Sequence, residues 1–173
     1  MNADPQPFAA GEPLPAPGLL VSVRSLDEFR RLVSQPVEVL DFKEPQRGAL
    51  AAADPQLWQQ AANEAPPACC LSAALGEWDT ALELAAHVPP RFAYAKAGPA
   101  GVPSTAALAN AWNELRQRLP QSVELVAVAY ADHQRAQCPL PEAIFHAAAD
   151  AGLRTWLVDT FDKSAGRDSL SWL

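Results

Sequence analysis

The sequence predicts an α/β fold in which helices cover the outer side of a parallel sheet. Two observations carry this prediction. Short apolar runs alternate along the chain with segments whose apolar residues recur at helical spacing. The apolar runs are continuous, as in residues 123–130, and a continuous run indicates a strand that is buried on both faces. Strands of this kind occur in parallel sheets whose neighbouring strands are joined by helices.

The expected elements follow one another in a regular order. Strands are predicted at residues 19–23, 37–44, 68–75, 91–98, 123–130 and 155–160. Helices are predicted at residues 25–33, 54–64, 78–88, 104–119 and 141–151.

Several helix ends carry signals of their own. Ser25 with Glu28 three residues later has the pattern of a capping box. Asp54 followed by Pro55 is typical of an N-cap and a first helical position. Gly152 follows the last predicted helix, where a glycine usually ends the helical conformation.

Composition and charge exclude several classes of function. The chain has 173 residues, 49% of them hydrophobic and 19% charged, which fits one globular domain with its own core. A net charge of -7 without a basic stripe argues against a nucleic-acid partner. No apolar run approaches the roughly 20 residues that span a bilayer, so no membrane partner is expected.

The predicted boundary between a tail and a folded domain rests on a change in composition after residue 18. Residues 1–18 hold five prolines and no basic segment, so they are expected to be a Pro-rich disordered tail rather than a secretory signal. Residues 19–173 are expected to form a (β/α) barrel domain. Cys69 and Cys70 are neighbours that would face opposite ways on a strand, which favours buried reduced thiols and a cytoplasmic location.

The second predicted strand ends in charged residues. Asp41 and Lys43 are two residues apart, so on a strand they would point to the same face. Pro45 then ends the strand, and the C-terminal ends of parallel strands are where α/β proteins bind ligands. A buried lysine beside an aspartate at this position is either a Schiff-base amine or a strand-end ion pair, and this stretch alone favours neither.

The three lysines of the chain share one kind of position. Lys43, Lys96 and Lys163 lie at or just after the ends of the second, fourth and sixth predicted strands. Alternate strands of a TIM (β/α)8-type barrel contribute to the same interior layer, so three amines would converge above one barrel mouth. The sequence contains no Gly-rich phosphate loop and no cluster of metal ligands.

The histidines do not add to this pattern. His87 and His146 lie on predicted helices, and His133 lies in a predicted loop. Each is interpreted as a structural or solvated residue.

Six strand–helix units are fewer than a complete TIM barrel has. A barrel of eight units usually needs about 200 to 250 residues, so this chain is expected to be truncated after about six βα units. The open edge of such a sheet would expose backbone groups and apolar surface. Poor solubility or pairing with a second copy in a homo-oligomer is therefore expected.

Five segments of the chain resemble one enzyme family, (5-formylfuran-3-yl)methyl phosphate synthase, which builds the furan ring of methanofuran. They are Leu19 to Ser25, Asp41-Phe42-Lys43-Glu44-Pro45 with Arg47-Gly48-Ala49-Leu50, Tyr94 to Gly98, Tyr130 to Asp132, and Val158 to Lys163. The resemblance runs in order from about Leu19 to Leu173, and the three lysines and two strand-end aspartates match the family's motifs.

The resemblance implies a fold, a reaction and a set of site residues. It implies a TIM barrel that joins two molecules of glyceraldehyde 3-phosphate, with release of phosphate and water, into a furan aldehyde phosphate. Lys43 would form the Schiff base with the substrate, and Lys96 would be the proton acceptor. Asp41, Asp159 and Lys163 would line the same site. No metal and no organic cofactor is implied.

Two other functions remain open at this point. The first is another Schiff-base aldolase that acts on sugar phosphates. The second is a truncated, non-catalytic homologue or partner subunit that keeps the lysines without a closed barrel.

Overall fold

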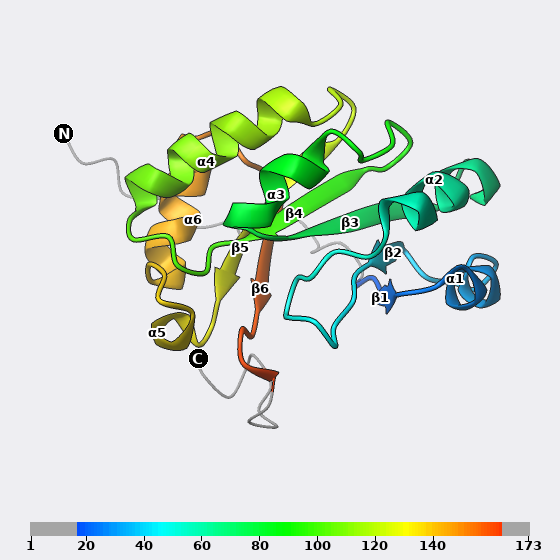
Figure 1. The fold of residues 1–173 in the computed structure, drawn as a ribbon, viewed down its shortest axis with the longest axis horizontal. Coiled ribbons are helices and arrows are strands. Elements are labelled where there is room, and N and C mark those ends of the chain that lie inside the picture. The colour runs from blue at the N-terminus through cyan, green and yellow to red at the C-terminus, as the bar shows by residue number, and fades with distance from the viewer. Residues whose placement is uncertain (1–16, 164–173) are drawn as a thin grey trace, which may run out of the picture.

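The computed structural model describes residues 17–163 and consists of a curled parallel sheet with helices on its outer side (Figure 1). The strands are β1 (Leu20–Val23), β2 (Val39–Phe42), β3 (Cys70–Glu77), β4 (Tyr94–Gly98), β5 (Glu124–Tyr130) and β6 (Trp156–Asp159). The helices are α1 (Leu26–Leu32), α2 (Pro55–Glu64), α3 (Trp78–Ala85), α4 (Thr105–Arg118), α5 (His133–Ala136) and α6 (Pro141–Asp150).

The six strands lie in the sheet in the order of the sequence, and every pair of neighbours is parallel. A sheet of this kind twists in one direction, so six strands in sequence order curl into part of a barrel wall. The predicted α/β class with a parallel sheet is therefore confirmed. Within residues 17–163, β1 and β6 each have one strand neighbour.

The N-caps at Ser25 and Asp54 form as the sequence predicts, but the Glu28 carboxylate accepts from Arg24 N rather than from Ser25 N, so only half of the predicted capping box forms. The Ser25 side chain accepts a hydrogen bond from the backbone N–H of Glu28 and caps α1. Asp54 accepts from Gln56 N at 2.8 Å at the start of α2, and Ser104 caps α4 in the same way. Each cap satisfies an amide that the helix itself leaves without a partner.

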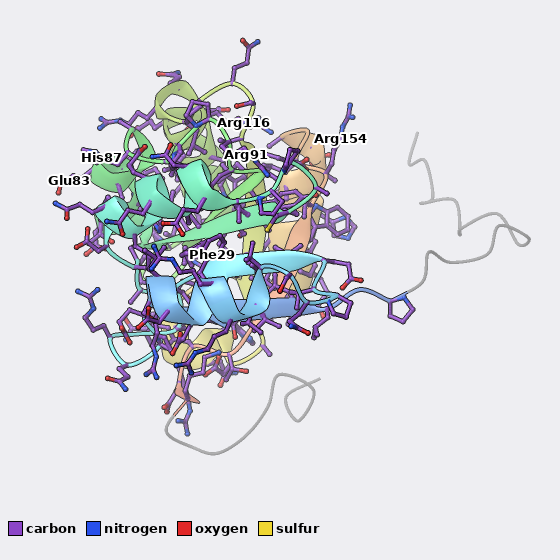
Figure 2. The ribbon with its side chains drawn as sticks, turned by 90° about the vertical axis from the view of Figure 1, so that its right-hand side faces the viewer. Phe29, Glu83, His87, Arg91, Arg116 and Arg154 are labelled. Carbon is purple, nitrogen blue, oxygen red and sulfur yellow. The ribbon has the colours of Figure 1, made fainter. Side chains whose placement is uncertain are left out.

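The larger core lies between the outer face of the sheet and the helices. Phe29 of α1 is fully buried and points toward the sheet (Figure 2). Its ring centroid lies 5.8 Å from that of Phe42, which in turn lies 5.6 Å from that of Phe92. These three rings fix the N-terminal half of the sheet to its covering helices, because aromatic pairs at this separation add to the burial of apolar area.

The inner face of the sheet carries a smaller second core. Its fully or nearly fully buried members are Ala49, Leu50, Ala74, Val128, Tyr130 and Ala136. Ala49 and Leu50 come from the loop between β2 and α2, and Leu50 accepts a hydrogen bond from the backbone N–H of Gly76. This contact folds the loop over the C-terminal end of the sheet.

Every strand begins one to three residues later than the sequence predicts, and β3 also ends later. β4 begins at Tyr94 rather than residue 91 because Phe92 N bonds back to Pro89 in a turn. Arg91, just before it, donates to the carbonyls of Pro66, Pro67 and Cys69. β3 continues to Glu77, with a register shift after Ala74.

Four further predictions need correction or fall outside the description. His133 begins the short helix α5, which the sequence analysis took as a loop, and His87 lies in the turn after α3. The three cysteines are free, but they are partly exposed rather than buried. The predicted tail of residues 1–18 lies almost wholly outside the described residues. No helix among residues 17–163 has the length and apolar character needed to cross a membrane.

Candidate active site

The charged residues singled out by the sequence meet at the C-terminal edge of the sheet. In Figure 1 the loop that follows β2 lies beside β6, and the two elements bring Lys43 and Asp159 together. Lys43 Nζ lies 3.9 Å from Asp159 Oδ2. Residues that are 116 positions apart in the chain therefore become neighbours because the sheet curls.

The backbone around Lys43 is held on both sides. Lys43 N donates to Val23 O of β1, and Lys43 also forms a bridge with Ala52. Glu44 N donates to Ala51 O, which closes the loop that contains Arg47 and Gly48. The lysine stem thus emerges from a fixed backbone, which a nucleophile requires for precise placement.

Burial sets the electrostatic state of Lys43. Its side chain is 16% exposed, and desolvation lowers the pKa of the amine below its ordinary value. Asp159 and Asp41 act in the opposite direction, while Lys163 and Lys96 lower the pKa further. The other four residues that the sequence assigned to this site are thus within electrostatic reach of the Lys43 amine.

Asp41 and Lys96 form a second, more deeply buried pair. Lys96 Nζ lies 2.6 Å from Asp41 Oδ1, and the two side chains are 4% and 0% exposed. The atoms are in ionic contact, although their angles are not those of a hydrogen bond. Asp41 Oδ2 accepts from Ser22 Oγ at 3.4 Å.

The Asp41–Lys96 pair spans β3, which lies between the two strands that carry it. The residues of β3 that register beside the pair are Ser72 and Ala74, both buried. Their small side chains leave room for a lysine and an aspartate to meet above them. The strand-end ion pair that the sequence allowed between Asp41 and Lys43 is therefore replaced by a longer-range pair.

Lys163 completes the group from the segment after β6. Its amine donates to Asp159 Oδ1, and its side chain is 44% exposed. Asp159 also accepts from the backbone N–H of Thr160. One carboxylate therefore faces two amines and one amide.

Asp132 fixes the segment that carries Lys163, and the sequence analysis assigned it no role. It is 3% exposed, and its two carboxylate oxygens accept from Phe161 N at 2.7 Å and from Asp162 N at 2.9 Å. Arg135 of α5 forms an ion pair with Asp162 on the same segment. Asp132 follows closely after β5, and an acidic residue at the end of an apolar strand is the sequence signal that could have identified it.

Glu77 is the second residue that the sequence analysis passed over. It ends β3 at the same edge of the sheet, and Tyr130 Oη donates a hydrogen bond to it at 2.6 Å. Burial raises the pKa of its carboxyl group. An acidic residue just after the predicted apolar strand of residues 68–75 is a signal in the sequence that could have identified it.

A cleft also opens at the opposite edge of the sheet, lined by residues that include Arg116, Ser122 and Arg154 (Figure 2). Arg116 donates to the carbonyl of Ala151, and Ser122 donates to that of Pro90. These bonds close chain ends and loops, so we assign this edge a structural role. Among residues 17–163, no group of three or more His, Cys, Asp or Glu side chains is arranged to hold a metal ion.

The comparisons with known proteins place the chain in one family. No curated protein matches the chain significantly. A family model described as 4-HFC-P synthase matches residues 19–172. The matched range contains all six strands and the five charged residues described above. The family that the sequence motifs resemble is therefore confirmed, and the chain belongs to the 4-HFC-P synthase family.

Proposed function

We propose that this chain catalyses the condensation of two glyceraldehyde 3-phosphate molecules to (5-formylfuran-3-yl)methyl phosphate, for methanofuran-type cofactor biosynthesis. The observation that carries the proposal is the half-buried Lys43 amine at the sheet's C-terminal edge, set among two carboxylates and two further amines in a chain of this family. The proposal includes a TIM-barrel identity for the curled six-stranded sheet.

The chemistry begins at Lys43. An amine attacks an aldehyde only in its neutral form, and an ordinary lysine with a pKa near 10.4 is almost wholly charged at about pH 7. Burial lowers the pKa of Lys43, which increases the neutral fraction. The amine adds to the aldehyde carbon of the first triose phosphate, water leaves, and an iminium remains.

The iminium draws electrons from the adjacent carbon, whose proton becomes acidic. The neutral form of Lys96 accepts that proton, and Asp41 holds the amine in place and stabilises the ammonium that results. The enamine that results attacks the aldehyde of the second molecule and forms the new carbon–carbon bond. Loss of phosphate and water then leads toward the aromatic furan, which drives the sequence forward.

Phosphate groups are the other feature of the substrate. Lys163 is the most exposed amine of the cluster, and we assign it to the substrate phosphate. This assignment needs no metal, because a lysine is a sufficient point charge for a phosphate.

Borohydride trapping tests the proposal. The purified chain is incubated with glyceraldehyde 3-phosphate, reduced, and mapped by peptide mass spectrometry, with product followed by furan absorbance in the near ultraviolet. We expect an adduct on Lys43, none on that residue's peptide in Lys43→Arg, and furan product only with the wild-type chain. A folded chain that gives no adduct contradicts the mechanism and favours a non-catalytic homologue. An adduct without furan absorbance indicates a simple aldolase.

A further inference from the structure

The carboxyl group of Glu77 differs from the two aspartates of the site in its partners. Asp41 and Asp159 each face lysine amines. Among residues 17–163, Glu77 forms no ion pair; it accepts from the Tyr130 phenol at 2.6 Å and from the backbone N–H of Ala100 at 3.1 Å. Neither partner carries a charge that would compensate a buried carboxylate.

The position of Glu77 relates it directly to the site. It lies at the C-terminal end of β3, and Tyr130 lies at the C-terminal end of β5 beside Asp159 of β6. Tyr130 is fully buried, and its ring packs on Phe161 with 5.4 Å between centroids. Glu77 and Phe161 both line a cleft that opens at this edge. The cleft that Glu77 lines thus reaches Phe161, which lies two residues after Asp159 and two before Lys163.

Gly98 makes the contact between Glu77 and Tyr130 possible. β4 lies between β3 and β5, so the hydrogen bond must pass over β4 at Gly98. A methyl group at Gly98 would overlap both the Glu77 carboxylate and the Tyr130 hydroxyl. A glycine is therefore needed two residues after Lys96, because any side chain there would displace the Glu77–Tyr130 hydrogen bond.

Resting on the function proposed above, we propose that Glu77, oriented by Tyr130 across Gly98, is the proton donor to the second aldehyde when the carbon–carbon bond forms. The enamine carbon bonds to the aldehyde carbon, and the carbonyl π pair moves to its oxygen. That oxygen takes the proton of Glu77 and becomes a hydroxyl group, and the iminium is restored. Glu77 is left as a carboxylate and regains its proton from solvent.

The electrostatic surroundings support an acid at this position. Burial raises the pKa of Glu77, as do Asp79 on α3 and Asp159 on β6. The Tyr130 hydroxyl on β5 and the Ala100 amide act in the opposite direction. In this site two carboxylates are paired with amines and a third is held away from cations, and such different environments allow one site to separate acid and base roles.

Glu77→Gln tests the proposal, with Glu83→Gln as matched control. Glutamine keeps an acceptor for the Tyr130 hydroxyl but has no acidic proton, and Glu83 is exposed on α3 (Figure 2). We expect Glu77→Gln to give the wild-type level of Lys43 adduct with glyceraldehyde 3-phosphate. Furan formation in a single turnover should fall by about 10²- to 10⁴-fold, the usual contribution of a positioned acid. Glu83→Gln should match the wild type in both measurements.

Tyr130→Phe supplies a second readout that a structural role would not move. Losing the phenol hydrogen bond removes an effect that lowers the pKa of Glu77, so the limb of the furan-formation pH profile due to Glu77 should move to higher pH. The role of Glu77 is refuted if Glu77→Gln forms furan within about twofold of the wild-type rate. It is also refuted if the pH profile of Tyr130→Phe is unchanged. Neither result contradicts the proposed function. A wild-type chain that forms neither adduct nor furan overturns the proposed function and this inference with it.

Discussion

Two lysine–aspartate contacts lie at the same edge of the sheet and differ in nearly every physical respect. Lys96 and Asp41 are 4% and 0% exposed and 2.6 Å apart, whereas Lys43 and Asp159 are 16% and 13% exposed and 3.9 Å apart. The first contact joins one amine to one carboxylate, and in the second the carboxylate is shared with Lys163. The comparison teaches that a loosely held amine is available for attack on a carbonyl, while a tightly held one is fixed in place.

The largest effect that sharpens this comparison is expected from Lys96→Gln. The amide can still hydrogen-bond to Asp41, but it cannot accept a proton from the substrate iminium. We expect furan formation to fall by about 10²- to 10⁴-fold while the Lys43 adduct persists. Peptide mapping after borohydride reduction checks the adduct, and loss of the Lys43 adduct in a folded Lys96→Gln chain would show that the two amines do not have separate roles.

The second-largest effect is expected on the stability of the chain, through the buried Asp41–Lys96 pair. Asp41→Leu leaves the Lys96 ammonium buried without its carboxylate, which should lower the free energy of unfolding by about 3–5 kcal/mol. Adding Lys96→Met removes the orphaned charge and should recover most of that loss. Urea unfolding of the single and double variants measures both, and a double variant no more stable than Asp41→Leu would contradict the account of the pair.

The segment that carries the looser contact is expected to depend on Asp132. Asp132→Ala removes the acceptor for two backbone amides, Phe161 N and Asp162 N, and should lower the free energy of unfolding by about 1–3 kcal/mol. The same change should weaken substrate binding, because Lys163 would lose its fixed position. Thermal unfolding and KM are the readouts, with exposed Asp150→Ala on α6 as control. Equal values in the two variants would refute the anchoring role.

The smallest expected effects are opposite shifts in the pH dependence of Lys43. Asp159 raises the pKa of Lys43, so Asp159→Asn should lower it and move adduct formation to lower pH. Lys163 lowers that pKa, so Lys163→Gln should move adduct formation to higher pH. Initial rates of trapping across pH give the midpoints, and shifts in the same direction would disprove the assignment of these charges.

Much of the fold follows from local pattern, because apolar runs and helix caps depend on neighbours in the chain. The caps at Ser25 and Asp54 form as expected, and the parallel sheet follows from the continuous strands. The one-turn helix α5 was not predicted, since it is too short for an apolar period and ends at Gln137 in the left-handed conformation. The late start of β4 likewise depends on side-chain bonds from Arg91 to a distant loop.

The site, like the fold, could be predicted only in part from the sequence. Strand-end charge in the sequence located Asp41, Lys43 and Lys96, the family resemblance added Asp159, and the curl of the sheet brings the four together. The pairing itself could not be read from the sequence, because Asp41 meets Lys96 only where Ser72 and Ala74 of the intervening strand are small. The role of Gly98 could not be predicted either, because it depends on a hydrogen bond between residues of two other strands.

The central claim is that Lys43 carries the reactive amine because burial lowers its pKa while its carboxylate contact stays loose. The most direct test is the pH dependence of borohydride trapping with glyceraldehyde 3-phosphate, resolved lysine by lysine by peptide mass spectrometry on the folded chain. The account predicts that Lys43 is trapped in preference to Lys96 and Lys163, with a midpoint below the ordinary lysine value of about 10.4. Trapping of all three lysines alike, or a Lys43 midpoint at or above that value, would contradict it.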